Sequence, residues 1–137
     1  MYNETMYLNY TDLNQIENKI LTLTNKLKQY NPSTPTFYSK NWTINEFPYI
    51  QEIDRIERGI NTLKDYWYKP DNWIDCKIWL NGDETEQVIK SFSYIDINRW
   101  IVDLDLMEVA LDEEVTLWNI QSYIYWNQES EENWREN

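Results

Sequence analysis

An eight-residue pattern that occurs three times is the feature that most constrains this chain. It begins at Tyr10 (YTDLNQIE), returns at Ile50 (IQEIDRIE) and returns again at Tyr94 (YIDINRWI). The copies share an aromatic residue or Ile, then an acid at the third position, an aliphatic residue, Asn or Asp, and an apolar residue at the seventh position. Internal repetition of this kind is typical of repeated supersecondary units, so each copy predicts one equivalent element.

The spacing of apolar residues predicts that each element is an amphipathic helix. Apolar residues continue beyond the pattern at positions 13, 16, 20, 23 and 27, at 53, 56, 60, 63 and 67, and at 97, 100, 104, 107 and 111. Alternating steps of three and four place them on one helical face. We therefore expect helices over about 9–29, 49–68 and 93–112. Their apolar faces predict one shared core that includes Ile16, Ile20, Ile56, Ile60, Leu63 and Leu104.

The acids of the pattern are interpreted as helix caps. Asn9 and Ser93 each stand three residues before an acid, Asp12 and Asp96, which is an Asp variant of the capping box. Glu52 holds the same position in the second copy and receives the same interpretation. The fifth position is polar in every copy and either bonds a neighbouring backbone or lies at the surface. Its residues are Asn14, Asp54 and Asn98.

The remaining segments give weaker signals. Thr116 to Asn127 keeps the helical step but contains several strand-forming aromatics, so it predicts a weaker fourth helix. Residues 73–80 alternate imperfectly and precede Asn81-Gly82-Asp83, which indicates a small β-hairpin near 73–90. The predicted fold is mainly α: a bundle of three repeated helices plus the fourth, with aromatic connectors, in one domain over 1–128. Residues 129–137 form an acidic tail.

Charge and composition exclude several classes of protein. The chain of 137 residues has a formal net charge of −12, whereas nucleic-acid binding requires a basic surface. No apolar run approaches the length of a transmembrane helix, and the first residues lack the basic and apolar regions of a signal peptide. We therefore expect neither a nucleic-acid partner nor a membrane partner.

The chain has no histidine, which removes most catalytic chemistry. Ser-His and Cys-His pairs and zinc sites with imidazole ligands are excluded. Cys76 is the one cysteine, so neither an internal disulfide nor a thiolate cage can form, and we expect a partly buried, inert thiol. The two glycines, Gly59 and Gly82, cannot form a phosphate-binding loop.

Carboxylates are the catalytic groups that remain. A glycosidase-like pair could come from Asp103 and Asp105, or from the group Asp83, Glu84 and Glu86 beside Trp79. Because the chain has 24 acids, such neighbours are unavoidable and do not indicate an enzyme. Residues 81–84 resemble a calcium loop too faintly to predict one. We predict no catalytic residue, no cofactor and no metal.

Aromatic residues make up 16% of the chain. They either pack in the core or form a surface that stacks on sugars or on a protein partner. Because the helix faces already supply most of a core, we predict that aromatics outside them contact other molecules. These candidate interface residues are Trp42, Trp73, Trp79, Trp126 and Trp134.

The three repeats resemble the helical Tyr-x-Asp-x-Asn-Arg-Ile-Glu segments of tail, baseplate and fibre-associated proteins in phages and prophages of Gram-positive bacteria. In those proteins a Trp or Phe segment often precedes the repeat, as Trp42 and Phe92 do here. The resemblance covers roughly residues 8–111. The first copy departs from it with Gln15 in place of Arg, and the third with Trp100-Ile101 in place of Ile-Glu.

The resemblance implies a structural virion protein that is made in the bacterial host cytoplasm and assembles with other virion proteins, in several copies or as a homo-oligomer. It implies no catalytic residue. A head decoration or head-fibre protein is an alternative location. A carbohydrate- or cell-surface-binding module that uses exposed Trp and Tyr is an alternative function.

Overall fold

The computed structural model describes residues 9–46, 48–80 and 92–113. By its internal contacts the chain divides into two compact units, Met1–Met107 and Glu108–Asn137. All contacts described below lie within the first unit. The predicted domain boundary at residue 128, the fourth helix and the acidic tail lie outside the described residues and stay predictions.

Helix α1 (Tyr10–Lys28) begins as the sequence predicts. The Asn9 side chain accepts hydrogen bonds from the backbone N–H groups of Thr11 and Asp12, and the Asp12 carboxylate accepts from the Asn9 N–H at 3.1 Å. This reciprocal capping box satisfies N–H groups that have no partner inside the helix. Lys26 and Lys28 in the last turn complement the negative end of the helix dipole.

Helix α2 (Ile50–Tyr66) and the third helix, over 94–113, differ in how they begin. The Asp96 carboxylate accepts from the Ser93 N–H at 3.0 Å, as predicted. Tyr49 precedes α2 and makes no side-chain cap. The capping interpretation of Glu52 is therefore wrong: its carboxylate accepts from the Lys40 ammonium at 2.8 Å, because a lysine from the preceding connector lies within reach.

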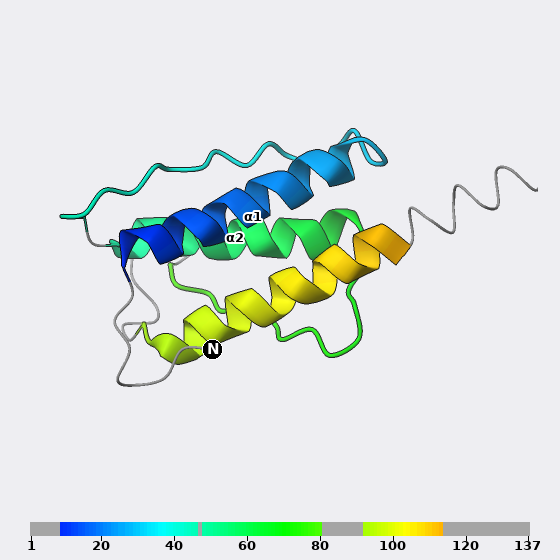
Figure 1. Ribbon diagram of the computed structural model, residues 1–137. Coiled ribbons are helices and arrows are strands. Elements are labelled where there is room, and N and C mark those ends of the chain that lie inside the picture. Colours follow the sequence, from blue (N-terminus) through cyan, green and yellow to red (C-terminus); the bar gives the residue numbers. More distant parts are fainter. Residues whose placement is uncertain (1–8, 47, 81–91, 114–137) are drawn as a thin grey trace, which may run out of the picture. The chain divides into compact units, whose positions relative to one another are not determined.

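Within the first unit, α1, α2 and residues 94–107 of the third helix run in the same direction. Arg55 of α2 contacts Glu17 of α1, both in the first half of their helices, while Asn31 after α1 bonds the Tyr66 carbonyl at the end of α2. Arg99 of the third helix contacts Glu57 at the matching level of α2. Each connector must therefore return along the bundle before the next helix begins, as the cyan segment beside α1 does in Figure 1.

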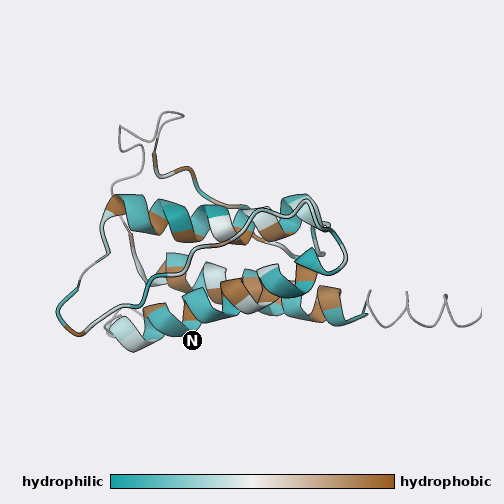
Figure 2. Cartoon of the chain, turned by 90° about the horizontal axis from the view of Figure 1, so that it is seen from above, coloured by the Kyte–Doolittle hydropathy of each residue, from teal (hydrophilic) through white to brown (hydrophobic). Residues whose placement is uncertain are grey.

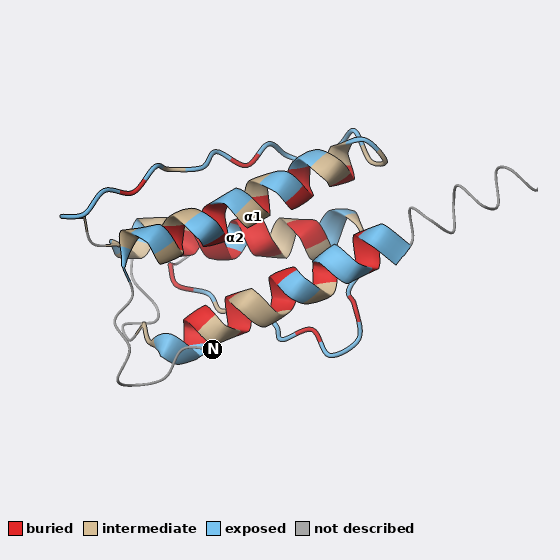
Figure 3. Ribbon diagram, viewed as in Figure 1, coloured by how far each residue is buried: buried red, intermediate tan, exposed pale blue. Residues whose placement is uncertain are grey.

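The predicted core is confirmed. Along α1, α2 and the third helix, buried residues alternate with exposed ones (Figure 3). Hydrophobic and hydrophilic residues alternate along the same helices (Figure 2). All six residues predicted for the core are at most 5% exposed: Ile16, Ile20, Ile56, Ile60, Leu63 and Leu104.

The first connector packs against α2 at Gly59, which is the one glycine among the described residues. A Cβ atom at Gly59 would lie 2.6 Å from the Phe37 ring, so the missing side chain lets the ring approach the helix backbone closely. The second connector, over 67–80, contains no strand; only Leu80 forms a bridge. The return arm of the predicted hairpin, 87–89, lies outside the described residues.

Candidate functional site

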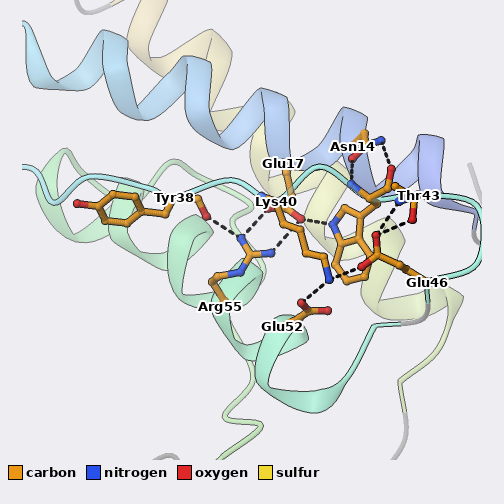
Figure 4. Close-up of polar contacts among 9 residues, drawn as sticks. Asn14, Glu17, Tyr38, Lys40, Thr43, Glu46, Glu52 and Arg55 are labelled. Carbon is orange, nitrogen blue, oxygen red and sulfur yellow. Dashed lines mark hydrogen bonds and ion pairs between the residues drawn. The ribbon is translucent and has the colours of Figure 1, made fainter.

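Glu17 of α1 is fully buried, and its carboxylate accepts hydrogen bonds from the first connector and from α2. The Arg55 guanidinium donates two hydrogen bonds to its carboxylate, at 2.6 and 3.0 Å. The Trp42 indole N–H and the Lys40 backbone N–H, at 2.8 Å, donate to the same carboxylate. Figure 4 shows Arg55 and Glu17 pointing toward one another across the first connector. The buried charge is thus paired and hydrogen-bonded, as a buried carboxylate requires.

Glu57 of α2 is the equivalent position in the second repeat and is arranged in the same way. It is 1% exposed, and the Arg99 guanidinium donates to its two oxygens at 2.6 and 2.5 Å. Two indole N–H groups complete the site, from Trp79 at 2.9 Å and Trp100 at 3.1 Å. Burial alone would lower the pKa of Arg99, but the hydrogen bonds and charge of Glu57 outweigh it and raise that pKa.

A lysine two residues before each connector tryptophan makes a second equivalent contact. Lys40 pairs with Glu52 at 2.8 Å and also with Glu46, and Figure 4 shows its ammonium between the two carboxylates. These contacts raise the pKa of Lys40. Lys77 pairs with Asp96 at 2.7 Å, and Asp96 occupies the position of Glu52 in the next repeat.

We call this arrangement the helix-linking module. It consists of a buried Glu on one helix, the Lys-x-Trp of the connector that follows, and the first-turn acid and Arg of the next helix. The first module is Glu17, Lys40, Trp42, Glu52 and Arg55. The second is Glu57, Lys77, Trp79, Asp96 and Arg99.

The module explains the two departures from the repeat pattern. Gln15 stands where Arg55 and Arg99 stand in the other copies, and no earlier described helix offers it a buried Glu. Ile101 stands where Glu17 and Glu57 stand, and no later described helix brings it an Arg. The first and third copies are therefore neutral at these positions.

The fifth position of the repeat differs between copies. The Asn14 side-chain amide accepts from the Trp42 N–H at 2.7 Å and donates to the Trp42 carbonyl at 3.1 Å. Of the two interpretations of this position, bonding to a neighbouring backbone therefore holds for Asn14. Asp54 pairs with the Arg58 guanidinium at 2.6 Å.

Three of the predicted interface tryptophans are core residues, which corrects that prediction. Trp42, Trp73 and Trp79 are 2%, 7% and 0% exposed, so a second molecule cannot reach them in the folded chain. The connectors carry them inside, where Glu17 and Glu57 accept the indole N–H groups of Trp42 and Trp79. Trp126 and Trp134 lie outside the described residues and stay predictions.

The candidate carboxylates do not form a catalytic pair within the described part of the chain. Asp103 is fully buried and accepts from the Ile74 N–H at 2.8 Å, whereas Asp105 is exposed and pairs with Lys19. Burial raises the pKa of Asp103 to about 6. Asp83, Glu84 and Glu86 lie outside the described residues.

Cys76 behaves as the sequence predicts. Its side chain is half-buried, and its thiol lies 3.8 Å from the Glu57 carbonyl oxygen, to which it donates. Burial, with Glu57 nearby, raises the pKa of the thiol, so the reactive thiolate is disfavoured.

The hollows on the surface of the first unit include the following two. One of about 260 Å³ is lined by residues of the first connector and α2, among them Tyr38, which is 78% exposed, Asp54 and Arg58. The other, of about 210 Å³, lies between α1 and the third helix and includes Asp12, Gln15 and Ile101 in its wall.

The described residues contain no group of three or more carboxylate or cysteine side chains placed to hold a metal ion. Within the same residues, no helix has the length and apolar composition needed to cross a bilayer. Comparison with protein-family models, curated proteins and solved structures gives no match.

Sequence reasoning missed Glu17 and Glu57 as the centres of the modules. Both were visible as acids next to an apolar face, each followed by a Lys-x-Trp segment and then by an Arg in the next repeat.

Proposed function

We propose that the chain is a non-enzymatic structural component of a phage virion, in the tail, baseplate or fibre-associated part, acting through protein–protein assembly. The observation that carries the proposal is the use of the repeated residues. The Asp, Arg and Glu of the motif that resembles virion repeats are the residues that join one helix to the next.

This use of the motif supports a scaffold rather than a catalyst. Glu17 and Glu57 are enclosed by Arg and Trp donors, so neither can reach a substrate without unfolding. The net charge of −12 favours solubility of free subunits before assembly. The partners proposed are other virion proteins, with the chain in several copies or as a homo-oligomer, and with neither nucleic acid nor membrane.

The experiment that tests this proposal locates the chain in particles. An epitope-tagged chain is produced from the phage or prophage that encodes it, and particles are purified on a density gradient with a detergent wash. Gold-labelled antibody at the tail, baseplate or fibres would support the proposal, and label at the capsid would move the chain to the head. Absence of the chain from washed particles would contradict the proposal. A tagged non-virion protein of the same phage is the control, because the wash should remove it.

Zymography on bacterial cell wall tests the non-enzymatic part of the proposal. We expect no clearing by the purified chain. Clearing that disappears after substitution of a single Asp or Glu would show a carboxylate hydrolase instead.

A carbohydrate-binding module is a second candidate, and one observation favours it. The hollow of about 260 Å³ combines the exposed ring of Tyr38 with the polar side chains of Asp54 and Arg58. Aromatic faces beside polar groups suit a sugar ring. Glycan-array binding that is lost in Tyr38→Ala and kept in Tyr49→Ala, an equally exposed tyrosine outside the hollow, would favour this candidate.

A further inference from the structure

The parallel arrangement makes the three helix pairs of the first unit equivalent. Among the described residues, two of these pairs hold a helix-linking module. Between α1 and α2 the groove contains Trp42, and between α2 and the third helix it contains Trp79. The third pair is the third helix with α1. Lys19 and Asp105 form an ion pair across it, which shows that these two helices also lie side by side.

The hollow of about 210 Å³ lies in this third groove, at positions that correspond to the filled ones. In the repeat register Asp12 corresponds to Glu52, Gln15 to Arg55, and Ile101 to Glu17. The residues that surround Lys40 and Trp42 in the first module thus have counterparts that line the hollow. We call this hollow the open groove; its wall consists of Asp12, Gln15, Ile16, Lys19, Ile101, Leu104 and Asp105.

We propose that the open groove binds an extended segment of a partner protein that carries a lysine two residues before a phenylalanine. The two filled grooves define this ligand, because each holds an extended connector with Lys two residues before an aromatic ring. The inference concerns the chain's own surface and holds whether or not the chain is a virion component.

Asp12 is the group that would receive the lysine. Its counterparts Glu52 and Asp96 receive Lys40 and Lys77. Asp12 also caps α1, but Asp96 shows that one carboxylate can do both: one oxygen accepts from the Ser93 N–H and the other from Lys77. A cationic segment is further favoured by the net charge of −12.

Ile101 determines which aromatic ring fits. In the filled grooves a buried Glu accepts the indole N–H, whereas Ile101 has no acceptor in its side chain. A tryptophan seated as Trp42 and Trp79 are would direct its N–H at Ile101 and bury it unpaired, which is unfavourable. A phenyl ring has no such donor, so phenylalanine should be preferred.

The ligand is assigned to a partner because the chain's own segments of this kind are in use. Lys40-Asn41-Trp42 and Lys77-Ile78-Trp79 occupy the other two grooves. In Lys90-Ser91-Phe92, which has the proposed spacing, the Phe92 ring already lies against Trp79 and Trp100. The sequences of residues 1–8 and 114–137 contain no lysine.

The test uses the full chain and synthetic peptides in calorimetric titrations, beginning with two. One has the sequence of residues 38–44, YSKNWTI, and the other is the same peptide with Trp42→Phe. We expect the Phe peptide to bind more tightly, by roughly tenfold if the unpaired indole N–H is fully buried. We also expect a Phe peptide with Lys40→Ala to bind less tightly than its parent.

Substitution Ile101→Glu in the full chain makes the test specific. The new carboxylate offers the acceptor found in the other grooves, so the preference should reverse in favour of the Trp peptide. Val102→Glu adds the same charge at the neighbouring position, outside the wall of the groove, and should leave the preference unchanged. Circular dichroism of each variant checks that it is folded.

Three outcomes would overturn the proposal. The first is that neither peptide binds the wild-type chain. The second is that Ile101→Glu and Val102→Glu change the Phe-to-Trp ratio equally. The third is a large gain in peptide affinity in Tyr2→Ala, because the start of the chain itself would then compete for the groove.

Discussion

The Arg99 guanidinium meets the Glu57 carboxylate with two parallel hydrogen bonds, and both side chains are almost completely buried. Arg55 and Glu17 repeat this contact one helix earlier, but there the Arg side chain remains 29% exposed. One sequence pattern thus builds two ion pairs that have the same geometry and differ in their access to water.

Glu57→Gln should destabilise the chain far more than Glu17→Gln. The substitution keeps the shape of the side chain but leaves the buried Arg99 charge with Asp96, at 3.4 Å, as its remaining carboxylate, for an expected loss of about 3–5 kcal/mol. Arg55 can reach water, so Glu17→Gln should cost less. Urea unfolding followed by circular dichroism measures both, and equal losses would contradict the difference in burial.

Local sequence made the helices, the caps at Asn9 and Ser93 and the six core residues predictable, because local residues determine those features. The cap expected from Glu52 was wrong, since Lys40 from the preceding connector pairs with that carboxylate. The direction of the helices was not predictable in the same way. It depends on connectors that return along the bundle, and on Glu17 meeting Arg55 across a long sequence separation.

The tryptophans show a second limit of sequence reasoning. Trp42 and Trp79 lie outside the helix faces, so their position alone suggested a surface. They are buried, and Glu17 and Glu57 accept hydrogen bonds from their N–H groups. Recognising that pairing requires the helix-to-helix register, which no single repeat contains.

Ile56→Ala tests whether α2 is packed in the shared core. Ile56 is fully buried, so truncation should cost about 2–5 kcal/mol through lost burial and the cavity left behind. Ile44→Ala is the matched control, since Ile44 is 76% exposed and should change stability little. A loss below about half a kcal/mol in Ile56→Ala would show that α2 is not packed as described.

Gly59→Ala should destabilise the chain although alanine favours helices by about 1 kcal/mol over glycine. The added methyl group would overlap the Phe37 ring, which must then move. Thermal unfolding of Gly59→Ala and of the double variant with Phe37→Ala checks the cause. If the alanine at position 59 destabilises equally in both backgrounds, the ring is not responsible.

Asp103 gives the stability of the chain a pH dependence of known sign. Its pKa is raised to about 6, because burial and the nearby charges of Glu57 and Asp75 outweigh the Ile74 N–H and Arg99. The folded state therefore holds the proton at pH values where the unfolded state has lost it. The contribution of Asp103 to the free energy of unfolding is therefore most favourable below about pH 4 and declines as the pH rises through about 6.

Asp103→Asn removes this ionisation and keeps an acceptor for the Ile74 N–H. Relative to the wild type, the variant should gain stability between about pH 4 and pH 7, by about 2 kcal/mol. Urea unfolding at several pH values measures the difference. A difference that stays constant over this range would contradict the raised pKa.

The most direct test of the helix-linking module observes its indole N–H groups by ¹⁵N-¹H NMR of the full chain. We predict that Glu57→Gln shifts the Nε1–H resonances of Trp79 and Trp100 and accelerates their hydrogen exchange, while Trp42 stays unchanged. Glu17→Gln should affect Trp42 and leave Trp79 and Trp100 unchanged. If either substitution leaves its own tryptophans unaffected, or if both shift the same resonances, the two carboxylates do not organise the helices as described.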